Sequence, residues 1–459
     1  MSHPREETSS VLKADLDHVW HPLTQHKKLA DRPPKMMVRG EGATITDAKG
    51  NDYLDGMAGL WCVNVGYGRS EIAEAVYQQL LELPYYPHTQ ANPPASRLAE
   101  RLSELTGGEP SRSYFVNSGT EANEAAFKLA RQYQRQVHPT EPRHKVVSRY
   151  LSYHGTSLST LAAGAFPERK SKFEPLPGDV VHVPPVYCYR CPFGLSYPSC
   201  DLACAKQVEY AIQAEGPETV GAVVVEPVSS AVGVLVPPPE YLSEVAAACE
   251  RHGVLLIVDE VINGFGRTGA WFAHQHFGVT PDLLCIAKGL TSGYQPLGAV
   301  MATTGVFDAF LGEPGEHKEA LQVNTWGGHA AACAGALANL EIMTAEELPK
   351  RAAYTGTYLL EQLRELLELP IVGDVRGLGL LLAVELVEEK EARTPLSGAR
   401  VAAVVGACSE GGVIVGRSTG TGAGLGNCIV LAPPLVLSEA EADRIVEVLT
   451  NALKVMSDE

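Results

Sequence analysis

The chain has 459 residues, of which 45% are hydrophobic and 20% are charged, and its formal net charge at pH 7 is −17. This composition is typical of a soluble globular protein with two or three domains. The negative charge argues against a nucleic acid or an anionic membrane as partner, although a local positive site can still bind a small anion.

The N-terminal residues, the lengths of the apolar runs and the spacing of the cysteines favour a cytoplasmic protein. Residues 1–8 (MSHPREET) lack the apolar segment of a secretory signal, and no run reaches the roughly 18 apolar residues that span a bilayer. The ten cysteines are scattered along the chain, unlike the dense spacing of a disulfide scaffold. We expect reduced thiols.

The N-terminal third begins with short elements. Residues 11–20 form an amphipathic stretch, and residues 41–55 have the pattern of a hairpin. Trp61 follows in a loop rich in glycine and aromatic residues, where it could fill a corner of the core or form the wall of a pocket. Helical periodicity covers residues 71–83 and 95–105.

A strand over residues 113–116 leads directly into Asn-Ser-Gly-Thr-Glu and a helix that runs to about residue 135. A glycine allows a tight turn, hydroxyls donate hydrogen bonds, and a helix N-terminus presents free N–H groups. The junction could therefore bind a phosphate, or it could be an ordinary N-cap.

Further strands end at residues that can carry chemistry. Apolar runs in the middle of the chain lead to Tyr153 and His154, to Glu226, to Asp259 and to Lys288. Because strands alternate with helices here, we expect a mostly parallel sheet with ligands at the carboxyl ends of its strands. An acid and a lysine at that edge suit pyridoxal phosphate, since the lysine forms a Schiff base and the acid keeps the pyridine nitrogen protonated. An ordinary salt bridge is the alternative.

The C-terminal part has a different character. A long helix is expected from residue 345 to 369, then strands that include 428–431, and a last helix that opens with a capping box at Ser438 and Glu441. We predict a small-domain arm and hairpin over residues 1–60, a large cofactor-binding domain over 61–344, and a small α+β domain over 345–459.

Cys188, Cys191, Cys200 and Cys204 lie close together in the sequence and could in principle hold a zinc ion. The gap between the two pairs is shorter than in common zinc ribbons. We therefore expect no metal and a proline-rich surface excursion with partly buried thiols.

The order of the motifs resembles the class III aminotransferases, a pyridoxal phosphate-dependent family of fold type I. The resemblance is carried by SGTEANEA at 118–125, Tyr-His-Gly at 153–155, Glu-Pro-Val at 226–228, VDEV at 258–261, IAKGLTSGYQPLG at 286–298 and a late threonine, Thr325. It runs from about residue 11 to the C-terminus.

The resemblance implies a role for each matching residue. Lys288 would form the Schiff base and move the proton between Cα and C4′, while Asp259 would pair with the pyridine nitrogen. Val261 and Tyr153 would pack on the two ring faces, and Glu226 and His154 would lie beside the cofactor. Ser118, Gly119 and Thr120 would hold the phosphate. Thr325 would reach it from the neighbouring subunit, which implies a homodimer or a homotetramer with shared sites.

The substrate is implied less directly. The segment at 59–69 resembles transaminases that use ω-amino acids or amines with pyruvate, and HPLTQH at 21–26 resembles their taurine–pyruvate branch. The ornithine and 4-aminobutyrate types carry a second glutamate after Glu-Pro, where this chain has Ser-Ser-Ala-Val-Gly at 229–233, and this difference favours pyruvate over 2-oxoglutarate. Candidate substrate-binding residues are Trp61, Tyr86, Tyr153, Ala231 and Arg417, the last as a mobile group for a carboxylate or sulfonate.

The predicted reaction is a ping-pong transfer of an amino group from taurine, β-alanine or a similar amine to pyruvate, giving an aldehyde or ketone and alanine. The alternatives are 2-oxoglutarate as acceptor, an aminomutase, racemase or decarboxylase on the same scaffold, and a metal-stabilised dimeric scaffold without catalysis.

Overall fold

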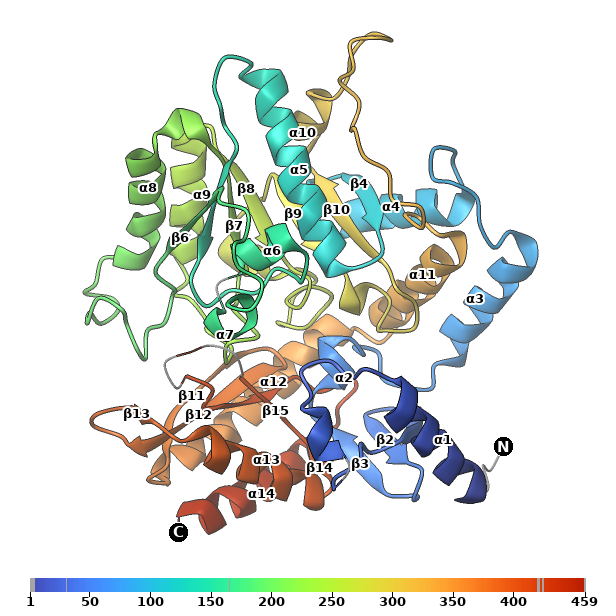
Figure 1. Cartoon of the computed structure of the whole chain (residues 1–459), viewed down its shortest axis with the longest axis vertical. Coiled ribbons are helices and arrows are strands. Elements are labelled where there is room, and N and C mark those ends of the chain that lie inside the picture. Colours follow the sequence, from blue (N-terminus) through green and yellow to red (C-terminus); the bar gives the residue numbers. More distant parts are fainter. Residues whose placement is uncertain (1–4, 30, 165, 419–421, 423–424, 458–459) are drawn as a thin grey trace.

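The computed structural model describes residues 5–29, 31–164, 166–418, 422 and 425–457. Figure 1 shows two parts stacked along the long axis, with a seven-stranded sheet in the upper part and two smaller sheets in the lower part. Both described ends of the chain lie in the lower part.

The seven-stranded sheet has the order β4-β10-β9-β8-β7-β5-β6. Strands β6, β5, β7, β8 and β9 run parallel to one another, while β10 pairs antiparallel with β9 and β4. The strands are β4 (Arg112–Val116), β5 (Lys145–Arg149), β6 (Val180–Val183), β7 (Val220–Val225), β8 (Leu255–Asp259), β9 (Leu283–Ile286) and β10 (Gly298–Ala302). The predicted mostly parallel sheet is confirmed.

The central strands β7, β8 and β9 are buried at every position, so both faces of the sheet are covered there. Along β8, Leu255 and Ile257 pack in the cluster that includes α5 (Gly119–Val137). The alternate residues Leu256 and Val258 pack in the cluster that includes α8 (Ala203–Glu215) and α9 (Tyr241–His252). Successive side chains of a strand point to opposite faces, so a strand that is covered on both faces needs apolar residues at every position. This explains the unbroken apolar runs in the sequence.

The other helices of the upper part are shorter or lie at the edge of the sheet. They are α3 (Ser70–Glu82), α4 (Pro93–Leu105), α6 (Leu158–Ala163), α7 (Pro167–Lys170), α10 (Thr304–Asp308) and α11 (Ala330–Ala345), with 3₁₀ turns η2 (Pro217–Thr219), η3 (Ala273–Phe277) and η4 (Lys288–Leu290). The short helix α2 (Ala58–Trp61) lies in the lower part in Figure 1. Helices α3 and α4 pack on α11. Asn92 caps α4, since its side-chain oxygen accepts the N–H of Ala95 at 2.9 Å.

The lower part contains a sheet of order β1-β2-β3-β14 and a sheet of order β11-β12-β16-β15, with β13 paired to β12. The strands are β1 (Met37–Glu41), β2 (Thr44–Asp47), β3 (Asp52–Asp55), β11 (Val372–Leu378), β12 (Leu381–Glu389), β13 (Thr394–Pro395), β14 (Val413–Ile414), β15 (Gly416–Arg417) and β16 (Cys428–Leu431). The helical elements are α1 (Arg5–His18), η1 (His26–Leu29), α12 (Leu348–Arg364), η5 (Glu365–Glu368), α13 (Gly398–Glu410) and α14 (Glu439–Ser457).

One helix is shorter in the structure than the sequence predicted, and one predicted helix cap is confirmed. The helix expected over residues 345–369 is wrong in length, because α12 ends at Arg364 and continues only as the 3₁₀ turn η5. Leu369 is extended because Pro370 follows it and disfavours the helical conformation. The capping box of α14 is present, with Ser438 N–H donating to the Glu441 carboxylate at 2.8 Å and Glu441 N–H donating to Ser438 Oγ at 3.3 Å.

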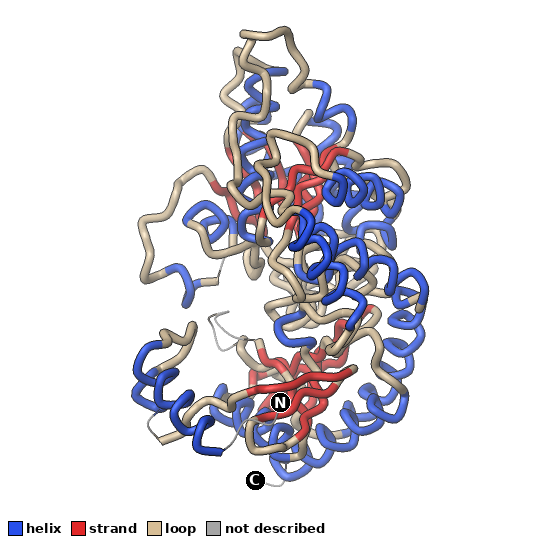
Figure 2. Tube along the Cα trace, turned by 90° about the vertical axis from the view of Figure 1, so that its right-hand side faces the viewer, coloured by secondary structure: helices blue, strands red, loops and turns tan. Residues whose placement is uncertain are grey.

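The division of the chain at residues 60 and 344 stays a prediction, but one strand pair bears on how the ends are arranged. β14 lies parallel to β3, with Val413 opposite Leu54. In the side view of Figure 2, strands of the lower part lie together at the end of the molecule that holds both chain ends. The N-terminal hairpin and the C-terminal segment thus share one sheet.

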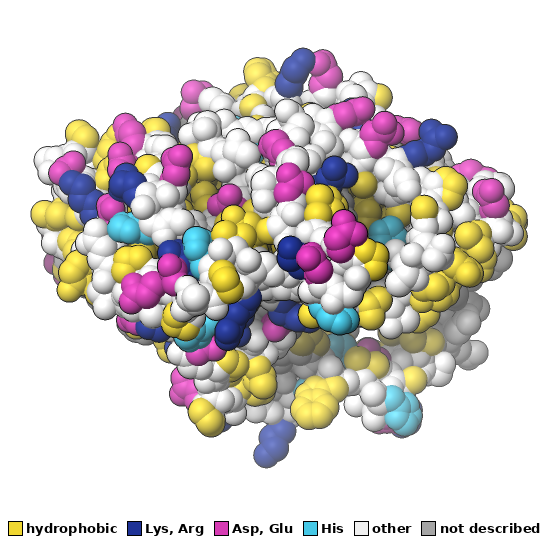
Figure 3. All heavy atoms as spheres, turned by 90° about the horizontal axis from the view of Figure 1, so that it is seen from above, with side chains coloured by type: hydrophobic (Ala, Val, Ile, Leu, Met, Phe, Trp, Pro, Cys, Tyr) yellow, Lys and Arg dark blue, Asp and Glu magenta, His cyan; other side chains and the backbone are white. Residues whose placement is uncertain are grey.

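Among the described residues, no helix is both long and apolar enough to cross a bilayer. Figure 3 shows acidic and basic side chains interspersed over that face. A polyanion-binding protein would instead gather its basic residues.

Arg267 connects the two parts of the molecule. Its side chain is fully buried, and its guanidinium donates to Asn64 Oδ1 at 2.7 Å and to the carbonyl oxygens of Leu380 at 3.1 Å and Pro433 at 2.5 Å. Burial lowers the pKa of Arg267 to about 9, so the group is still charged at neutral pH. Because the planar guanidinium donates to three acceptors on different segments, Arg267 holds the upper and lower parts of the molecule together.

We expect Arg267→Lys to destabilise the protein by about 2–3 kcal/mol, because a lysine cannot serve all three acceptors and leaves buried oxygens unsatisfied. The measurement is the urea midpoint of unfolding. Arg131→Lys is the matched control, since Arg131 forms a half-exposed ion pair with Asp179 at 3.2 Å and should change stability by less than about 1 kcal/mol. Equal shifts in the two variants would contradict the role given to Arg267.

Candidate active site

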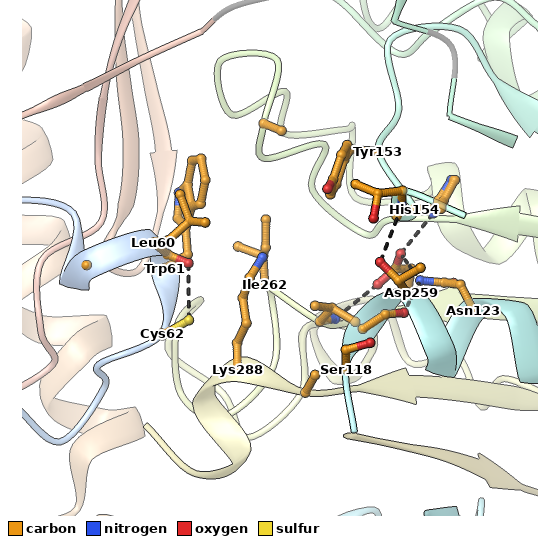
Figure 4. A pocket seen from close by; sticks show the side chains of 18 of the residues that line it. Leu60, Trp61, Cys62, Ser118, Asn123, Tyr153, His154, Asp259, Ile262 and Lys288 are labelled. Atoms are coloured by element: carbon orange, nitrogen blue, oxygen red, sulfur yellow. Dashed lines mark hydrogen bonds and ion pairs between the residues drawn. The ribbon is translucent and has the colours of Figure 1, made fainter. Parts of the chain in front are cut away.

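One large cavity of about 1300 Å³ opens at the carboxyl ends of the parallel strands. Its wall combines segments that follow β4, β5, β7, β8 and β9 with segments of the lower part of the molecule. The predicted site residues that line it are Trp61, Ser118, Gly119, Thr120, Tyr153, His154, Glu226, Ala231, Asp259, Val261, Lys288 and Arg417. Residues far apart in the sequence therefore meet in one place, as Figure 4 shows for several of them.

Asp259, the last residue of β8, is buried and fully hydrogen-bonded. Its Oδ2 is 2.8 Å from His154 Nδ1 and accepts from Asn123 Nδ2 at 2.8 Å, while its Oδ1 accepts from the N–H of Val261 at 3.1 Å. Only 4% of its surface is exposed. Three partners fix the position of this carboxylate at the cavity wall.

His154 continues this network away from the cavity. Its Nε2 is 3.4 Å from Ser148 Oγ, and its side chain is completely buried. If Nδ1 carries the proton and donates to Asp259, then Nε2 can accept from the serine hydroxyl. The histidine is thus held by contacts at both ring nitrogens.

The N-terminus of α5 faces the cavity through Ser118, Gly119 and Thr120. Ser118 is the N-cap, and its Oγ accepts the N–H of Glu121 at 3.1 Å. A Cβ atom at Gly119 would lie 2.6 Å from Cγ1 of Val261, so only glycine permits this approach. The helix end offers N–H groups and a partial positive charge to an anion in the cavity.

Glu226 lines the cavity and follows β7 directly. Its carboxylate accepts the N–H groups of Tyr153 at 3.2 Å and Ser230 at 3.3 Å, and its carbonyl oxygen accepts from Arg149 Nη2 at 2.5 Å. Burial raises the pKa of Glu226, while the nearby positive groups act in the opposite direction. Glu226 links the segments that follow β5 and β7.

Lys288 follows β9 and begins η4 with a positive φ of 45°. Such a backbone conformation costs a non-glycine residue about 1–3 kcal/mol and is typical of functional sites. Figure 4 shows the side chain between Trp61 on one side and Tyr153 and Asp259 on the other, and Nζ lies 5.5 Å from the centre of the Trp61 ring. Among the described residues, no hydrogen bond or ion pair to Nζ occurs.

The charge state of Lys288 follows from its surroundings. Burial lowers the pKa of Lys288, and this effect outweighs the opposing influence of Cys62, Asp259 and Glu226. A lysine with a lowered pKa is more often the neutral amine, which can act as a nucleophile or base.

Two predicted residues lie outside this cavity. Thr325 and Tyr86 are both exposed, and neither lines the cavity of its own chain. The Thr325 carbonyl oxygen accepts from Tyr85 Oη at 2.9 Å. A role for Thr325 or Tyr86 in a site therefore requires a neighbouring chain, and it stays a prediction.

Sequence reasoning missed several residues that line the cavity. Asn123 binds Asp259, and its only sequence signal is its spacing of one helical turn from Gly119, whose carbonyl oxygen it also reaches at 3.2 Å. Cys62 and Arg169 also line the cavity. The sequence offered no pattern that could distinguish either of them from a surface residue.

The cysteine-rich segment forms a separate small surface feature. Cys188, Cys191, Cys200 and Cys204 border one narrow pocket, with Cys188 exposed and the others half-buried, and all four are free thiols. Among the described residues, no group of three or more histidine, cysteine or acidic side chains is placed to hold a metal ion. Burial raises the pKa of Cys204 to about 11, so this thiol is protonated at neutral pH.

The wall of the cavity suits one kind of molecule. It offers an anion site at the end of α5, a buried carboxylate in Asp259, apolar surfaces in Val261 and Tyr153, and an amine in Lys288. A phosphorylated heteroaromatic aldehyde has the complementary groups, namely a phosphate, a ring nitrogen, two ring faces and a carbonyl carbon. The residues thus fit pyridoxal phosphate.

A model of the Aminotransferase class-III family matches residues 27–453. The chain is 44% identical to an uncharacterised aminotransferase, YhxA, of Bacillus subtilis, with 98% of each chain covered. It is 39% identical to a taurine–pyruvate aminotransferase of Rhodobacter capsulatus, with 98% of each covered. It is 37% identical to a diaminobutyrate–2-oxoglutarate transaminase of Halomonas elongata, with 98% of this chain and 96% of the relative covered.

Solved structures agree with these relatives. An aminotransferase from Bacillus anthracis superimposes with a TM-score of 0.94 at 44% identity, covering 99% of this chain and all of the other. An amine transaminase from an uncultivated Pseudomonas species, solved in its pyridoxal phosphate-bound form, superimposes with a TM-score of 0.91 at 37% identity, covering 95% of this chain and 98% of the other.

We expect Gly119→Ala to weaken binding of the cofactor about tenfold or more, because the new methyl group would overlap Val261 and push it into the cavity. The measurement is the dissociation constant of pyridoxal phosphate. Gly305→Ala in α10 is the matched control, since its Cβ meets no atom within 4 Å. The double variant Gly119→Ala, Val261→Ala should bind better than Gly119→Ala alone, and no recovery would contradict the steric cause.

We expect Lys288→Met to stabilise the cofactor-free protein, most at neutral or lower pH. The pKa of Lys288 is lower in the folded state than in the unfolded state. Below that lowered pKa the buried amine is charged, and the full cost of burying this charge reduces the free energy of unfolding. The cost disappears as the pH rises to the ordinary lysine value of about 10.4. Melting temperatures from pH 7 to about pH 10 should therefore converge for wild type and variant, and a difference that stays constant over this range would contradict the buried-charge explanation.

Proposed function

The chain belongs to the class III aminotransferases, which use pyridoxal 5′-phosphate, and we propose that it transfers the amino group of an ω-amino acid or primary amine, such as taurine or β-alanine, to pyruvate. The products would be an aldehyde or ketone and alanine. The fold, the residues of the cavity and a taurine–pyruvate relative that aligns over almost its whole length support this proposal.

The observation that carries the choice of pyruvate is the segment at 229–233. Ala231 lines the cavity, and the N–H of Ser230 is committed to Glu226 at 3.3 Å. The segment contains no carboxylate. An acceptor with a second carboxylate, such as 2-oxoglutarate, needs an arginine that binds this carboxylate and moves aside for other substrates. Residues 229–233 offer no carboxylate with which the displaced arginine could pair.

We assign the cofactor contacts from the geometry of the cavity wall. Ser118, Gly119 and Thr120 would bind the phosphate at the N-terminus of α5, and Asp259 would hold the protonated ring nitrogen. Val261 and Tyr153 would flank the ring, with His154 and Glu226 supporting this arrangement. When bound, pyridoxal phosphate supplies an aldehyde that condenses with amines and a ring that takes up electrons.

We assign proton transfer to Lys288. Its Nζ would take the proton from the substrate carbon that bears the nitrogen and deliver it to C4′ within the same half-reaction, and it would carry the proton in the reverse direction when the keto acid is the substrate. Burial lowers the pKa of Lys288, which supplies the neutral amine that this step needs. Trp61, across the cavity mouth at 5.5 Å from Nζ, would restrict the side chain that a substrate can carry and exclude water from the lysine.

We also propose that two chains share their active sites. The loop before α11 exposes Leu321, Val323 and Trp326 at 63%, 74% and 55%, and soluble monomers rarely leave such apolar surface uncovered. Thr325 lies within this loop and Tyr86 is 55% exposed, so both could complete the cavity of a neighbouring subunit. Class III aminotransferases typically act as dimers, which agrees with this arrangement.

A second candidate keeps the reaction but uses 2-oxoglutarate as the acceptor. It is favoured by the diaminobutyrate–2-oxoglutarate relative, which aligns at 37% identity. Arg417 lines the cavity and could bind the second carboxylate of this acceptor.

We expect taurine, β-alanine or a simple amine to bleach the visible absorbance band of the cofactor in the absence of an acceptor. Pyruvate should then restore the band at least about tenfold more efficiently than 2-oxoglutarate and form alanine. The measurement is a spectroscopic half-reaction for each donor, followed by each acceptor. Recovery with 2-oxoglutarate alone would support the second candidate, and the absence of any half-reaction would point to an aminomutase or decarboxylase.

Lysine variants provide the controls for the same assay. Lys288→Ala should lose about 1000-fold or more in rate, because it removes the amine to which the proposed mechanism assigns proton transfer. Lys145→Ala should retain the rate, since Lys145 is paired with Glu215 at 2.8 Å and does not line the cavity. A fully active Lys288→Ala variant would contradict the assignment.

A further inference from the structure

Arg169 is a cationic residue of the cavity wall that neither the motifs nor the proposed mechanism uses. It lies on α7 and lines the same cavity as Lys288 and Trp61. In Figure 1, α7 is at the lower edge of the upper part, where it faces the lower part that carries Arg417 on β15. Among the described residues, the cationic side chains of the cavity wall are Arg169, Lys172, Lys288 and Arg417.

Arg169 is held on an aromatic platform. Its guanidinium carbon lies 5.4 Å from the centre of the Tyr153 ring and 5.1 Å from that of Phe166. The two rings contact each other edge to face at 6.0 Å, and Phe166 is buried. A guanidinium held against aromatic rings loses side-chain freedom before any ligand arrives.

The platform connects Arg169 to the reacting part of the site. Tyr153 lines the cavity beside Asp259 and is one of the residues proposed to flank the cofactor ring. Burial raises the pKa of Tyr153, and the charge of Arg169, 5.4 Å from the ring centre, acts in the opposite direction. The positive charge is therefore placed next to the ring that a bound substrate would approach.

The proposed reaction requires two different anions to use this cavity in turn. In pyruvate the carboxylate is attached to the carbon that receives the nitrogen. In taurine or β-alanine the acid group is attached to the neighbouring carbon instead. Because Lys288 fixes the position of the reacting carbon, the two acid groups must lie at different places, and one rigid cation cannot suit both.

Arg417 and Arg169 differ in how freely their side chains can move, and two acid groups at different positions require such a difference. Arg417 is exposed, lies on a two-residue strand and, within the part of the chain that the structure describes, donates a single 3.3 Å hydrogen bond to the Gly398 carbonyl oxygen, so it can adjust its position. Arg169 is half-buried and fixed by two rings. A fixed cation suits an acid group at a set distance from the reacting carbon.

We propose that Arg169 determines specificity for acidic donors by binding the sulfonate or carboxylate at the far end of an ω-amino acid, and that Arg417 serves the keto acid. This inference rests on the proposed function, because it requires ω-amino acids to be donors. Glu168 and Lys172 also line the cavity, and both are exposed.

The test uses the holoenzyme and the variants Arg169→Gln and Arg169→Lys. The matched control is Lys170→Gln, which removes a positive charge from the next residue of α7 without lining the cavity. Each variant is assayed for kcat and KM with taurine, β-alanine, propylamine and pyruvate. Binding of 2-hydroxyethanesulfonate, which has the acid group of taurine but no amine, is measured separately by calorimetry.

We expect Arg169→Gln to raise KM for taurine and β-alanine about 10- to 100-fold and to weaken binding of 2-hydroxyethanesulfonate by a similar factor. KM for propylamine and pyruvate should stay within about twofold, since neither has an acid group at that position. Arg169→Lys should show an intermediate loss, because it keeps the charge but not the paired donors. Lys170→Gln should resemble wild type.

Other results overturn the inference in distinguishable ways. If Arg169→Gln slows all four substrates equally, then Arg169 only positions Tyr153, and its role in specificity is wrong. If acidic donors and 2-hydroxyethanesulfonate are unaffected, Arg169 does not bind the acid group, and the proposed function stands. If wild-type enzyme is bleached by propylamine but by neither acidic donor, both the choice of donor and the inference fail.

Discussion

The site depends first on a buried carboxylate that would be costly to bury alone. Moving an ionised carboxylate into a protein interior costs several kcal/mol unless hydrogen bonds compensate for lost water. Asp259 obtains this compensation from His154, from Asn123 and from the backbone at Val261. These contacts join β8 to α5 and to the segment after β5. The same interactions that keep Asp259 in the core also set the position of the helix end that faces the cavity.

Lys288 shows the opposite arrangement, and the contrast explains how the site can do chemistry. Asp259 has partners on both oxygens, whereas no described residue pairs with Lys288 Nζ by a hydrogen bond or an ion pair. A carboxylate held by three hydrogen bonds is fixed in place, while burial lowers the pKa of Lys288 and leaves an amine that is more readily neutral. The chain thus places a fixed carboxylate and a reactive base at the ends of adjacent strands, β8 and β9.

The sequence was sufficient for features that depend on neighbouring residues. Unbroken apolar runs predicted strands buried on both faces, and the residues that follow them do meet at one sheet edge. Asn123 could not be predicted, because its partner Asp259 lies 136 residues further along the chain and an asparagine inside a helix usually faces solvent. Arg267 was missed for the same reason, since its acceptors come from three distant segments. The helix expected over 345–369 was too long because the apolar pattern continues through η5 while the hydrogen-bond pattern changes before Pro370.

The pairing of β14 with β3 has a consequence for how the protein is made. Leu54 leaves the ribosome long before Val413, yet the two residues belong to adjacent strands. Until β14 has been synthesised, one edge of β3 is unpaired, and an unpaired edge can pair with other chains. The cavity is also incomplete in this period, because residues 414–417 supply part of its wall. Assembly of the catalytic cavity is therefore among the last steps of folding, and chains truncated before β14 should be unable to complete it.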